Sequence, residues 1–400
     1  MSEGIKFIHA ADLHLDSPFI GLSDLDEELF ENIKESTFTA LNNLIEEAIK
    51  HQVDFVLIVG DLFDNSEQSL KAQIKLKAAF EKLNKYDIKV YLSYGNHDFT
   101  QGNLYPVEYP NNVYIYPDEQ VTYFTHYQNN KPVANIYGFS YETRAVNEDK
   151  IPEYNPINTN EIAYHIATLH GSADSPHGHA NYAPFKLQEL KDRSFDYWAL
   201  GHIHKREILS ENPPIVYPGN IQGRHRNEAG EKGCYLVHLT KEETNLEFLK
   251  LGTIEFESIK VELNEDDGIH ELKDKINQLI SKDTLELIHL TINSQTDEIT
   301  EWEKNERLAE LIQLINDLQQ GHIYKYKINL NTGTFFENNY FFDQLLTHLK
   351  ESTIEESIND LLTHSQARKY PDIYDINEED LKKRAEEILT LEFYNRGEVK

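Results

Sequence analysis

Residues 5–16 have the sequence IKFIHAADLHLD, in which an apolar run is followed by Asp12 and His14. The apolar residues at 5–9 predict a strand buried on both faces, because the run is nearly continuous rather than alternating. A polar pair directly after such a strand is either an ordinary strand-end cap or part of a binding site. Asp12 and His14 alone do not distinguish a strand-end cap from a binding site, and the rest of the chain is needed to decide between them.

The same pattern of strand followed by polar residues returns along the first half of the chain. Further runs rich in Val, Ile and aromatic residues predict strands at 53–59, 88–94, 133–139, 162–169 and 195–200. Two helix-like segments separate the first three strands. Their apolar faces hold Leu41, Leu44, Ile45 and Ala48, and then Ile74, Leu76, Ala79, Phe80 and Leu83. This alternation predicts an α/β sheet, and we expect Trp198 in its core.

Candidate ligands stand at the ends of five of these strands. They are Asp12 with His14, Asp61, Asn96 with His97, His170, and His202 with His204. In an open α/β sheet the carboxyl ends of the strands meet at one crevice, so residues distant in sequence come together there. Each group alone has an ordinary structural explanation, but all five in order predict one site.

The kinds of donor indicate the metal and the chemistry. Carboxylate and amide oxygens combined with imidazole suit manganese, and a thiolate cluster is excluded because Cys234 is the only cysteine. We expect Asp61 to bridge two ions, which would activate a water and hold the attacking and departing oxygens of a phosphate ester. His97 is positioned to stabilise negative charge or to protonate the leaving oxygen.

The remaining sequence predicts a second domain and a tail. Stretches 101–132 and 141–160 predict surface loops or short edge strands. From about residue 255 the pattern is strand, helix, strand, helix, strand. Its helical faces hold Leu272, Ile276, Leu279 and Ile280, then Leu308, Leu311, Ile312, Ile315 and Leu318. In its last strand Tyr324, Tyr326, Ile328 and Leu330 are expected to face the core, and Lys325 and Lys327 the solvent. Three amphipathic segments after Asn338 predict a helical tail.

The acidic charge argues against a nucleic-acid ligand, but it is unevenly distributed. The chain of 400 residues carries a net charge of −31, of which −16 falls in residues 251–400, whereas residues 201–250 balance seven basic against seven acidic side chains. Within that balanced stretch, Arg224, His225 and Arg226 are candidate contacts for a substrate phosphate. The two arginines could equally form internal salt bridges. We therefore expect weak, mildly salt-dependent DNA binding by the isolated chain.

Five segments in this order resemble the calcineurin-like metallophosphoesterase superfamily. They are Asp12-Leu13-His14, Gly60-Asp61, Gly95-Asn96-His97-Asp98, His170-Gly171 and Gly201-His202-Ile203-His204. Three longer segments are similar to its SbcD-like DNA-repair exonuclease branch: Ala11-Asp12-Leu13-His14-Leu15-Asp16, Gly60-Asp61-Leu62-Phe63-Asp64 and Tyr217-Pro218-Gly219-Asn220. The run through Ile221-Gln222-Gly223-Arg224-His225, Asn227-Glu228 and Lys232-Gly233 is similar to the bacterial YhaO type. The resemblance to the superfamily covers roughly residues 5–250.

The resemblance implies an α/β fold, namely a four-layer αββα sandwich at 1–252, with a smaller α+β capping domain at 253–335 and a helical tail at 336–400. It also implies two divalent metal ions, most commonly Mn²⁺, with one held by Asp12, His14, Asp61 and His204 and the other by Asp61, Asn96, His170 and His202. His97 would be the catalytic histidine. One position departs from the pattern, because Asp64 stands where many relatives carry a second catalytic histidine.

The function implied is a metal-dependent DNA exonuclease or endonuclease subunit in DNA repair. Its expected partners are DNA, an SMC-like coiled-coil ATPase that docks on the tail, and a second copy of the chain as a homodimer. Intramolecular packing is an equally good explanation for the tail. Alternatives are a phosphatase or phosphodiesterase acting on a non-DNA ester, and an inactive scaffold. His177 and His179 are expected to be loop residues.

No leader is expected at the N-terminus, because Asp12, His14 and Asp16 interrupt the apolar segment that begins at Ile5. The sequence therefore predicts a soluble cytoplasmic protein without a membrane partner.

Overall fold

The computed structural model describes most of the first 330 residues and part of the remainder. The described residues are 4–22, 25–64, 68–102, 107–157, 161–173, 182–280, 285–318, 321–330, 340–351, 382 and 385. Residues 1–330 form one compact unit and residues 331–400 a second. The expected boundary at 252/253 lies within the first unit and stays a prediction.

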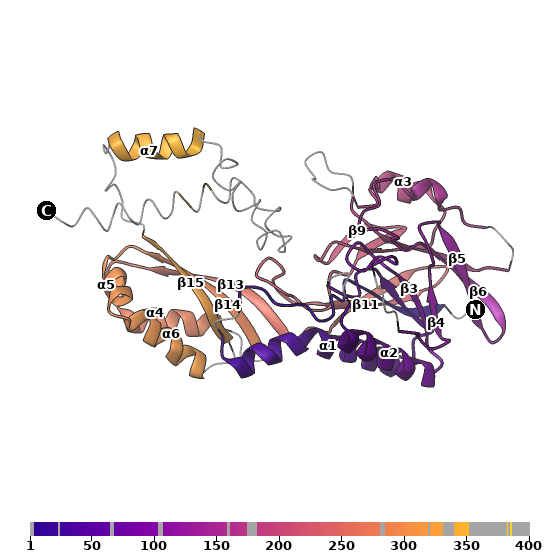
Figure 1. The fold of residues 1–400 in the computed structure, drawn as a ribbon, viewed down its shortest axis with the longest axis horizontal. Coiled ribbons are helices and arrows are strands. Elements are labelled where there is room, and N and C mark those ends of the chain that lie inside the picture. Colours follow the sequence, from indigo (N-terminus) through magenta and orange to yellow (C-terminus); the bar gives the residue numbers. More distant parts are fainter. Residues whose placement is uncertain are drawn as a thin grey trace. The chain divides into compact units, whose positions relative to one another are not determined.

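The first of two large sheets carries the N-terminal strand. It has six strands in the order β12-β11-β1-β2-β3-β4. Their bounds are β1 (Ile5–Ala11), β2 (Phe55–Val59), β3 (Lys89–Ser93), β4 (Val113–Ile115), β11 (Gly233–Leu239) and β12 (Thr244–Lys250). Strands β1 to β4 are parallel, so the carboxyl ends of β1, β2 and β3 lie at the same edge of the sheet. Figure 1 labels β3, β4 and β11 of this sheet.

The second large sheet also has six strands, in the order β5-β6-β7-β8-β10-β9. Their bounds are β5 (Thr122–Gln128), β6 (Lys131–Gly138), β7 (Tyr164–His170), β8 (Tyr197–Gly201), β9 (Glu207–Glu211) and β10 (Pro214–Tyr217). Strands β6, β7, β8 and β10 are parallel. The six strands expected from the sequence are confirmed as β1, β2, β3, β6, β7 and β8, and β4 and β5 are the short edge strands expected within 101–132.

An apolar core joins the two sheets face to face. Phe7 of β1 stacks on Phe55 of β2 with ring centroids 4.9 Å apart, and it meets Tyr197 of β8 edge to face at 5.3 Å. All three side chains are fully buried. Rings packed in this way contribute beyond the area that they bury, so the contact fixes how the strand ends of one sheet lie against those of the other.

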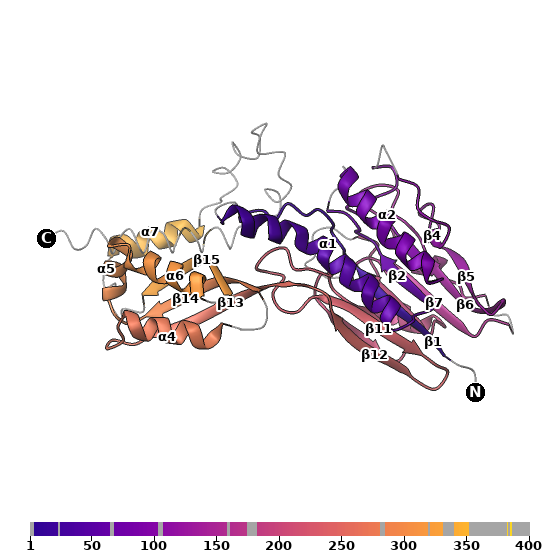
Figure 2. The same cartoon turned by 90° about the horizontal axis from the view of Figure 1, so that it is seen from below.

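Two long helices cover the outer face of the first sheet (Figure 2). Helix α1 (Glu27–Lys50) begins at Asp26, whose Oδ1 accepts hydrogen bonds from two backbone amides of the first turn. Helix α2 (Leu70–Lys85) begins at Ser69 in the same manner. The expected apolar faces are buried except for Ile74, which is 53% exposed. That expectation was wrong because Ile74 lies on the side of α2 that turns away from the sheet.

A thinner layer covers the outer face of the second sheet. It contains the short helix α3 (Leu187–Asp192), the 3₁₀ turn η1 (Ile151–Glu153) and loop residues. Trp198 is fully buried here, as expected, and packs against Tyr154 and Phe195. The two sheets and their two covering layers confirm the four-layer sandwich.

The third sheet has three parallel strands in the order β13-β14-β15. Its elements are β13 (Ile254–Leu263), α4 (Ile269–Leu279), β14 (Leu285–Ser294), α5 (Glu298–Lys304), α6 (Arg307–Leu318) and β15 (Gly321–Leu330). One face packs on the helices through Leu272, Ile276, Leu308 and their neighbours. Leu279 is 51% exposed, contrary to expectation, because it lies in the last turn of α4 and points away from the sheet.

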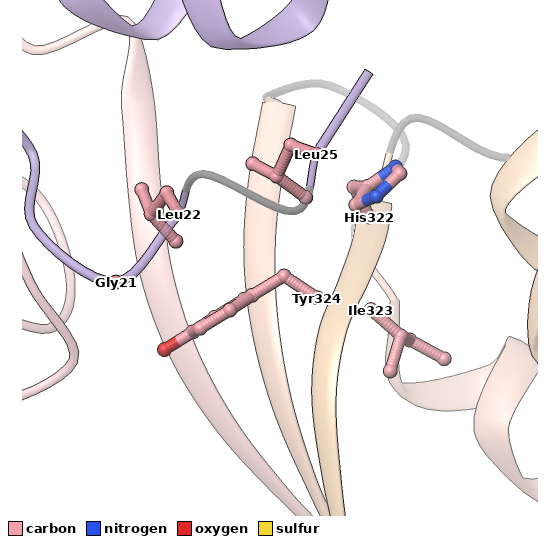
Figure 3. Close-up of a pocket in the computed structure, with 6 residues that line it drawn as sticks. All are labelled: Gly21, Leu22, Leu25, His322, Ile323 and Tyr324. Atoms are coloured by element: carbon pink, nitrogen blue, oxygen red, sulfur yellow. The ribbon is translucent and has the colours of Figure 1, made fainter.

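The other face of this sheet packs on the N-terminal part of the chain, where Phe256 and Leu287 contact Phe19, Leu22 and Ile33. Tyr324 belongs to this face, although the sequence places it with Tyr326. A register shift in the pairing of β14 with β15 inserts one extra residue there. The bulge rotates Tyr324 to the opposite side, where it lines a small cavity with Leu22, Leu25 and His322 (Figure 3).

The second unit is described only in part. Helix α7 (Tyr340–Glu351) confirms the first amphipathic segment of the tail. The other two predicted segments lie outside the described residues, apart from the helical Lys382 and Ala385. Among the helices that the structure describes, none is both long enough and apolar enough to cross a bilayer.

Candidate metal centre

The predicted ligands lie where the strand ends of the two sheets meet. Asp12 follows β1 and Asp61 follows β2, and they are tied together because the amide of Asp12 donates to the carbonyl of Gly60. His170 ends β7 and His202 follows β8 in the second sheet. The backbone amide of His202 donates to both carboxylate oxygens of Asp12 at 3.1 Å, which links the two sheets.

The backbone at these residues is strained. Asp12, His14, Asp61 and His202 have φ angles of 52°, 41°, 50° and 95°, in the left-handed region that side chains other than glycine rarely adopt. Each such residue costs on the order of 1 kcal/mol, and such costs cluster at functional sites. The four conformations therefore indicate that the directions of these side chains matter more than local stability.

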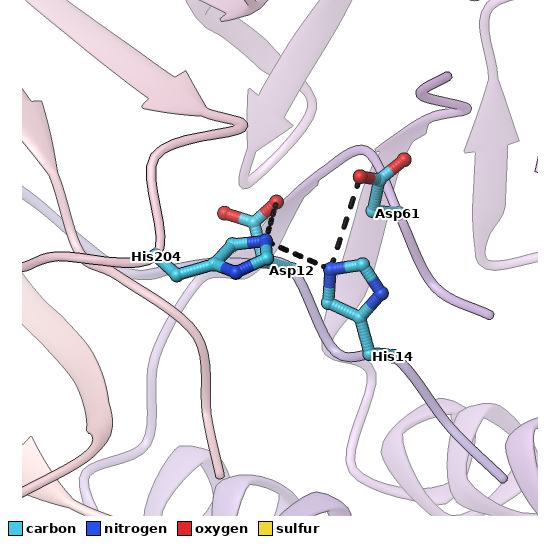
Figure 4. A group of neighbouring side chains, drawn as sticks. All are labelled: Asp12, His14, Asp61 and His204. Atoms are coloured by element: carbon cyan, nitrogen blue, oxygen red, sulfur yellow. Dashed lines mark hydrogen bonds and ion pairs between the residues drawn. The ribbon is translucent and has the colours of Figure 1, made fainter. Parts of the chain in front are cut away.

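The first group of donors, site 1, comprises Asp12, His14, Asp61 and His204 (Figure 4). His14 Nε2 lies 3.0 Å from His204 Nε2 and 3.8 Å from Asp61 Oδ2. His204 Nε2 in turn lies 3.9 Å from Asp12 Oδ1. The donor atoms of four side chains thus converge on one point.

The second group, site 2, contains Asp61, His170 and His202, with Asn96 beside them. Asp61 Oδ2 lies 3.3 Å from His170 Nε2. The side-chain oxygen of Asn96 lies 3.1 Å from both His170 Nε2 and His202 Nδ1. Asp61 Oδ2 therefore faces both groups, which is the position that a bridging ligand would need.

Contacts behind the donors fix two imidazole rings. His170 Nδ1 lies 3.0 Å from the carbonyl of Val59, so this nitrogen carries a hydrogen and Nε2 is the atom that faces the site. His204 Nδ1 lies 2.6 Å from Glu228 Oε1, with the same effect on its Nε2. Hydrogen bonds of this kind set the tautomer and orientation of metal-binding histidines.

Three glycines let the strand ends approach the donors. A side chain at Gly60 would overlap the ring of His170, and one at Gly95 would overlap the Asp61 carboxylate. A side chain at Gly201 would overlap the carbonyl of Val59. Gly60 also has a φ of +75°, so glycine is required there on both counts.

The geometry fits two cations. In site 1 the Nε2 atoms of His14 and His204 lie 3.0 Å apart beside two carboxylates, a spacing at which both nitrogens can bind one cation. Site 2 offers the carboxylate of Asp61, which belongs to both groups, with one amide oxygen and two imidazoles. Such mixed oxygen and nitrogen sets accommodate divalent manganese, iron or zinc, so the residues present fit the group and leave the identity of the metal open.

The pKa values of the donors are perturbed in opposite directions. Burial lowers the pKa of His14 and of His202 to about 3. Burial would also lower the pKa of His170, but the charges of Asp61 and Asp12 raise it to about 9. Burial would raise the pKa of Asp61, yet His170 holds it well below its ordinary range. In the metal-free protein at neutral pH, Asp61 and His170 are therefore an ion pair.

His97 lies next to site 1 but outside both donor groups. Its ring meets that of His14 edge to face, with centroids 5.0 Å apart. His97 Nδ1 lies 2.7 Å from the backbone carbonyl of Asp64, and the His97 amide donates to Asp61 Oδ1 at 3.0 Å. This placement is compatible with the expected role in proton transfer, which stays a prediction.

Asp98 holds the loop that carries Asn96 and His97. It is fully buried, and its carboxylate accepts hydrogen bonds from the amides of Gly95 and Leu62. Burial and the nearby Asp61 raise the pKa of Asp98 to about 7. The residue thus joins the loop after β3 to the loop after β2.

The loop with the candidate phosphate contacts lies beside site 1. Arg224 is only 12% exposed and forms ion pairs with Asp64 and with Glu228. His225 and Arg226 are exposed on the same loop. The internal salt bridges considered for the two arginines are thus present for Arg224.

Glu228 was missed as a functional candidate. Its segment was noted for the resemblance, but a single acidic residue in a loop carries no periodic signal, and only the fold brings it to His204. Its pKa is lowered far below the ordinary range, since His204 and Arg224 outweigh burial. His177 and His179 lie outside the described residues.

Comparison with known proteins places these features in one family. Residues 5–206 match the model of the calcineurin-like phosphoesterases. The chain is 36% identical over 401 residues to the metallophosphoesterase YhaO of Bacillus subtilis (strain 168), an alignment that covers 97% of this chain and 98% of that protein.

Two archaeal proteins are more distant relatives. The DNA double-strand break repair protein Mre11 of Methanocaldococcus jannaschii is 26% identical over 292 residues, covering 70% of this chain and 75% of that protein. Mre11 of Thermoplasma acidophilum is 25% identical over 292 residues, covering 69% and 73%.

Proposed function

Because this chain belongs to the calcineurin-like phosphoesterase family, and is therefore a metal-dependent phosphoester hydrolase, we propose that it is a nuclease that hydrolyses phosphodiester bonds in DNA. The observation that carries the proposal is the pair of donor groups joined at Asp61 Oδ2, with His97 beside them. Support for DNA comes from the similarity to Mre11 proteins named for double-strand break repair.

We propose that site 1 and site 2 each hold one Mn²⁺ ion. Two divalent ions held by these residues would lower the pKa of a bound water and neutralise charge on the phosphate. The residues of the chain set the positions and orientations of the donor groups. Asp61 orients both groups, Val59 and Glu228 fix the rings of His170 and His204, and the strained backbone aims Asp12 and His14.

His97 supplies the proton chemistry in this scheme. With Nδ1 donating to the Asp64 carbonyl, its Nε2 is the nitrogen left to act on the substrate. When it is protonated, Nε2 donates to the departing oxygen, and when it is neutral, Nε2 orients the attacking water. The Asp98 carboxylate holds the loop, so the ring keeps its place relative to site 1.

A second candidate is hydrolysis of a non-DNA phosphate ester. It is favoured by the charge of the site surroundings, because Arg224 is paired with Asp64 and Glu228 and the whole chain carries −31. Arg224 is then not free to neutralise the phosphates of a polyanion. The inactive scaffold is the weakest alternative, since every expected donor is present.

We also propose that the tail from residue 336 binds an SMC-like coiled-coil ATPase. Helix α7 offers an amphipathic face of the kind that helix-binding grooves accept. Copurification of such an ATPase with the full chain, and its loss when residues 336–400 are deleted, would support this. Copurification that survives the deletion would contradict it, as would absence of the ATPase from a cleavage-competent preparation.

The decisive experiment compares DNA with simple esters. Purified protein is incubated with Mn²⁺ and linear or single-stranded DNA, beside nitrophenyl phosphate and bis-nitrophenyl phosphate. The variants are Asp61→Ala and His97→Ala, with His238→Ala as a matched control on the exposed side of β11. DNA cleavage lost in the first two variants and kept in the control supports the nuclease. Ester hydrolysis without DNA cleavage favours the second candidate.

A further inference from the structure

Arg224 connects two loops that flank site 1. Its Nη1 pairs with Oδ1 of Asp64, on the loop after β2, and its Nη2 lies 3.1 Å from Oε1 of Glu228. The side chains of Asp64 and Glu228 are 19% and 4% exposed. A guanidinium that pairs with two largely buried carboxylates has little freedom to move, because the N–H donors of its planar group engage both acceptors at once.

Each of these carboxylates also contacts a histidine of site 1. Glu228 Oε1 lies 2.6 Å from His204 Nδ1, and Asp64 Oδ1 lies 3.5 Å from His14 Nδ1. His14 and His204 are the two rings whose Nε2 atoms face each other at 3.0 Å. Arg224 is therefore connected to His204 through the Glu228 hydrogen bond and by a direct contact of 3.3 Å from Nη2 to Nδ1, and to His14 only through the longer contact of Asp64.

Glu228 is itself fixed from several sides. Its Oε2 accepts hydrogen bonds of 2.8 Å from Asn220 Nδ2 and from the amide of Arg224. Lys232 Nζ donates to the backbone carbonyl of His204 at 3.1 Å, so the same loop also holds the main chain of the ligand. Glu228 thus has little freedom to choose another partner.

Site 2 does not depend on this network. His170 is oriented by the carbonyl of Val59, and the amide of His202 is bound by Asp12. The ring of Tyr182 lies against that of His202, with centroids 4.9 Å apart. The two sites share Asp61 but differ in what supports them.

We propose that Arg224, Asp64 and Glu228 are positioning residues that set the metal affinity of site 1, and that Arg224 acts on the metal ligands rather than on a substrate phosphate. The inference rests on the metal pair of the proposed function and is independent of DNA as the substrate. Arg224 Nε is buried and has no hydrogen-bond partner in the described part of the chain; contact with a substrate phosphate through the guanidinium is the rival role.

The test measures Mn²⁺ binding at each site separately, by calorimetry and by the electron paramagnetic resonance signal of bound Mn²⁺. His170→Gln serves as the background that reports site 1, and His14→Gln as the background that reports site 2. Into each we introduce Arg224→Gln, Arg224→Lys or Glu228→Gln. Arg226→Gln is the matched control, because it removes the same charge two residues away on the exposed part of the loop.

The expected result is asymmetric. Arg224→Gln and Glu228→Gln should weaken Mn²⁺ binding at site 1 by roughly 10- to 100-fold, the usual effect of removing a hydrogen-bond partner of a metal ligand, and should leave site 2 nearly unchanged. The Mn²⁺ affinity of Arg224→Lys at site 1 should lie between that of the wild type and that of Arg224→Gln, since an ammonium cannot engage both carboxylates in the same way. Arg226→Gln should change neither site.

Three outcomes would overturn the inference. One is unchanged Mn²⁺ affinity at site 1 in Arg224→Gln. Another is equal weakening of both sites in a variant with a normal thermal transition, which would indicate general disruption. The third is unchanged Mn²⁺ affinity with at least tenfold weaker binding of inorganic phosphate, which would make Arg224 a phosphate ligand. If Arg224→Gln does not fold, Glu228→Gln and Arg224→Lys decide by the same comparison. A wild-type protein that binds no Mn²⁺ would instead refute the proposed function.

Discussion

His97 Nδ1 lies 2.7 Å from the backbone carbonyl oxygen of Asp64. Because a main-chain acceptor holds one nitrogen, the other is left for chemistry, and we expect His97→Gln to lower kcat by about 10²- to 10⁴-fold, the usual contribution of a general acid or base. Mn²⁺ affinity should not change, since His97 lies outside both donor groups. Steady-state kinetics beside calorimetric titration test this. A variant with normal kcat would remove His97 from the mechanism.

Asp61 should be the one residue whose loss affects both sites. Asp61→Asn keeps the shape but removes the charge that Oδ2 presents to His14 and His170. We expect the number of tightly bound Mn²⁺ ions to fall from two to one or none, whereas Asn96→Ala should weaken site 2 alone. Metal content after gel filtration, measured by inductively coupled plasma spectrometry, gives the answer. Two retained ions in Asp61→Asn would show that Asp61 does not bridge.

Much of this centre could be predicted because the sequence marks strand ends clearly. A buried run followed at once by Asp12, Asp61 or Asn96 needs only the general topology of parallel strands to indicate convergence. The contacts that Glu228 and Asp64 make with the histidines of site 1 could not be predicted in this way. Glu228 and Asp64 reach the site through loops without periodicity, and the histidines that they contact, His204 and His14, lie far from them in sequence.

Metal binding at site 2 should depend on pH, and that at site 1 much less. The charges of Asp61 and Asp12 raise the pKa of His170 to about 9, so His170 is protonated in the metal-free protein at pH 7 and must lose its proton when a cation binds. Site 2 affinity should therefore rise with pH up to about 9. His14, with a pKa lowered to about 3, is already neutral.

Titrations in buffers of different ionisation enthalpy count the protons released. In the His14→Gln background, which reports site 2, we expect close to one proton per ion at pH 7. In the His170→Gln background the number should be smaller, because the proton of His170 is absent and His14 is already neutral. Equal proton release in the two backgrounds would contradict the assignment of the raised pKa to His170.

Gly95 should not tolerate a side chain. A Cβ there would overlap Asp61 Oδ1 and lie 2.8 Å from His170 Nε2, so Gly95→Ala must displace a donor of site 2. We expect weaker Mn²⁺ binding at site 2 and a loss of stability of about 1–3 kcal/mol, the usual cost of overpacking. Gly268→Ala is the control, because a Cβ there would meet only Glu271 Oε2, at 3.0 Å. Urea unfolding and titration measure both effects.

The metal-free protein should lose stability in acid, and two core histidines outside the metal centre contribute to this loss beside His14 and His202. Burial lowers the pKa of His9 to about 3 and that of His126 to about 4, from an ordinary value of 6.5. Above pH 6.5 both are neutral in the folded and unfolded chains, so their contribution is intact. Below 6.5 the unfolded chain takes up protons first, and each group costs up to about 1.4 kcal/mol per pH unit until its folded pKa is reached.

Urea unfolding in the presence of a chelator, between pH 7.5 and 5, measures this slope. His126→Gln should make the slope shallower at the expense of stability at pH 7.5, because the hydrogen bond with Tyr91 is altered. An unchanged slope in His126→Gln would show that this histidine is not responsible.

The third sheet, formed by β13, β14 and β15, shows where the sequence pattern alone is insufficient to predict the structure. Alternation along β15 predicts one face for Tyr324 and Tyr326, but pairing with β14 inserts an extra residue and separates them. A bulge depends on the register between two strands, and no local feature of the segment reports it. Ile74 and Leu279 were misplaced for a related reason, since spacing identifies an apolar stripe but not how far a neighbouring sheet extends beneath it.

The left-handed backbone at Asp12, His14, Asp61 and His202 puts selection for stability in conflict with selection for activity. Glycine adopts that conformation without strain, so replacing any one of the four by glycine relieves a local cost while removing a donor. A library screened only for heat resistance of the metal-free chain should accumulate glycine at these positions, and the enriched clones should be inactive. The metal centre thus occupies positions at which a screen for stability alone would replace the donor residues first.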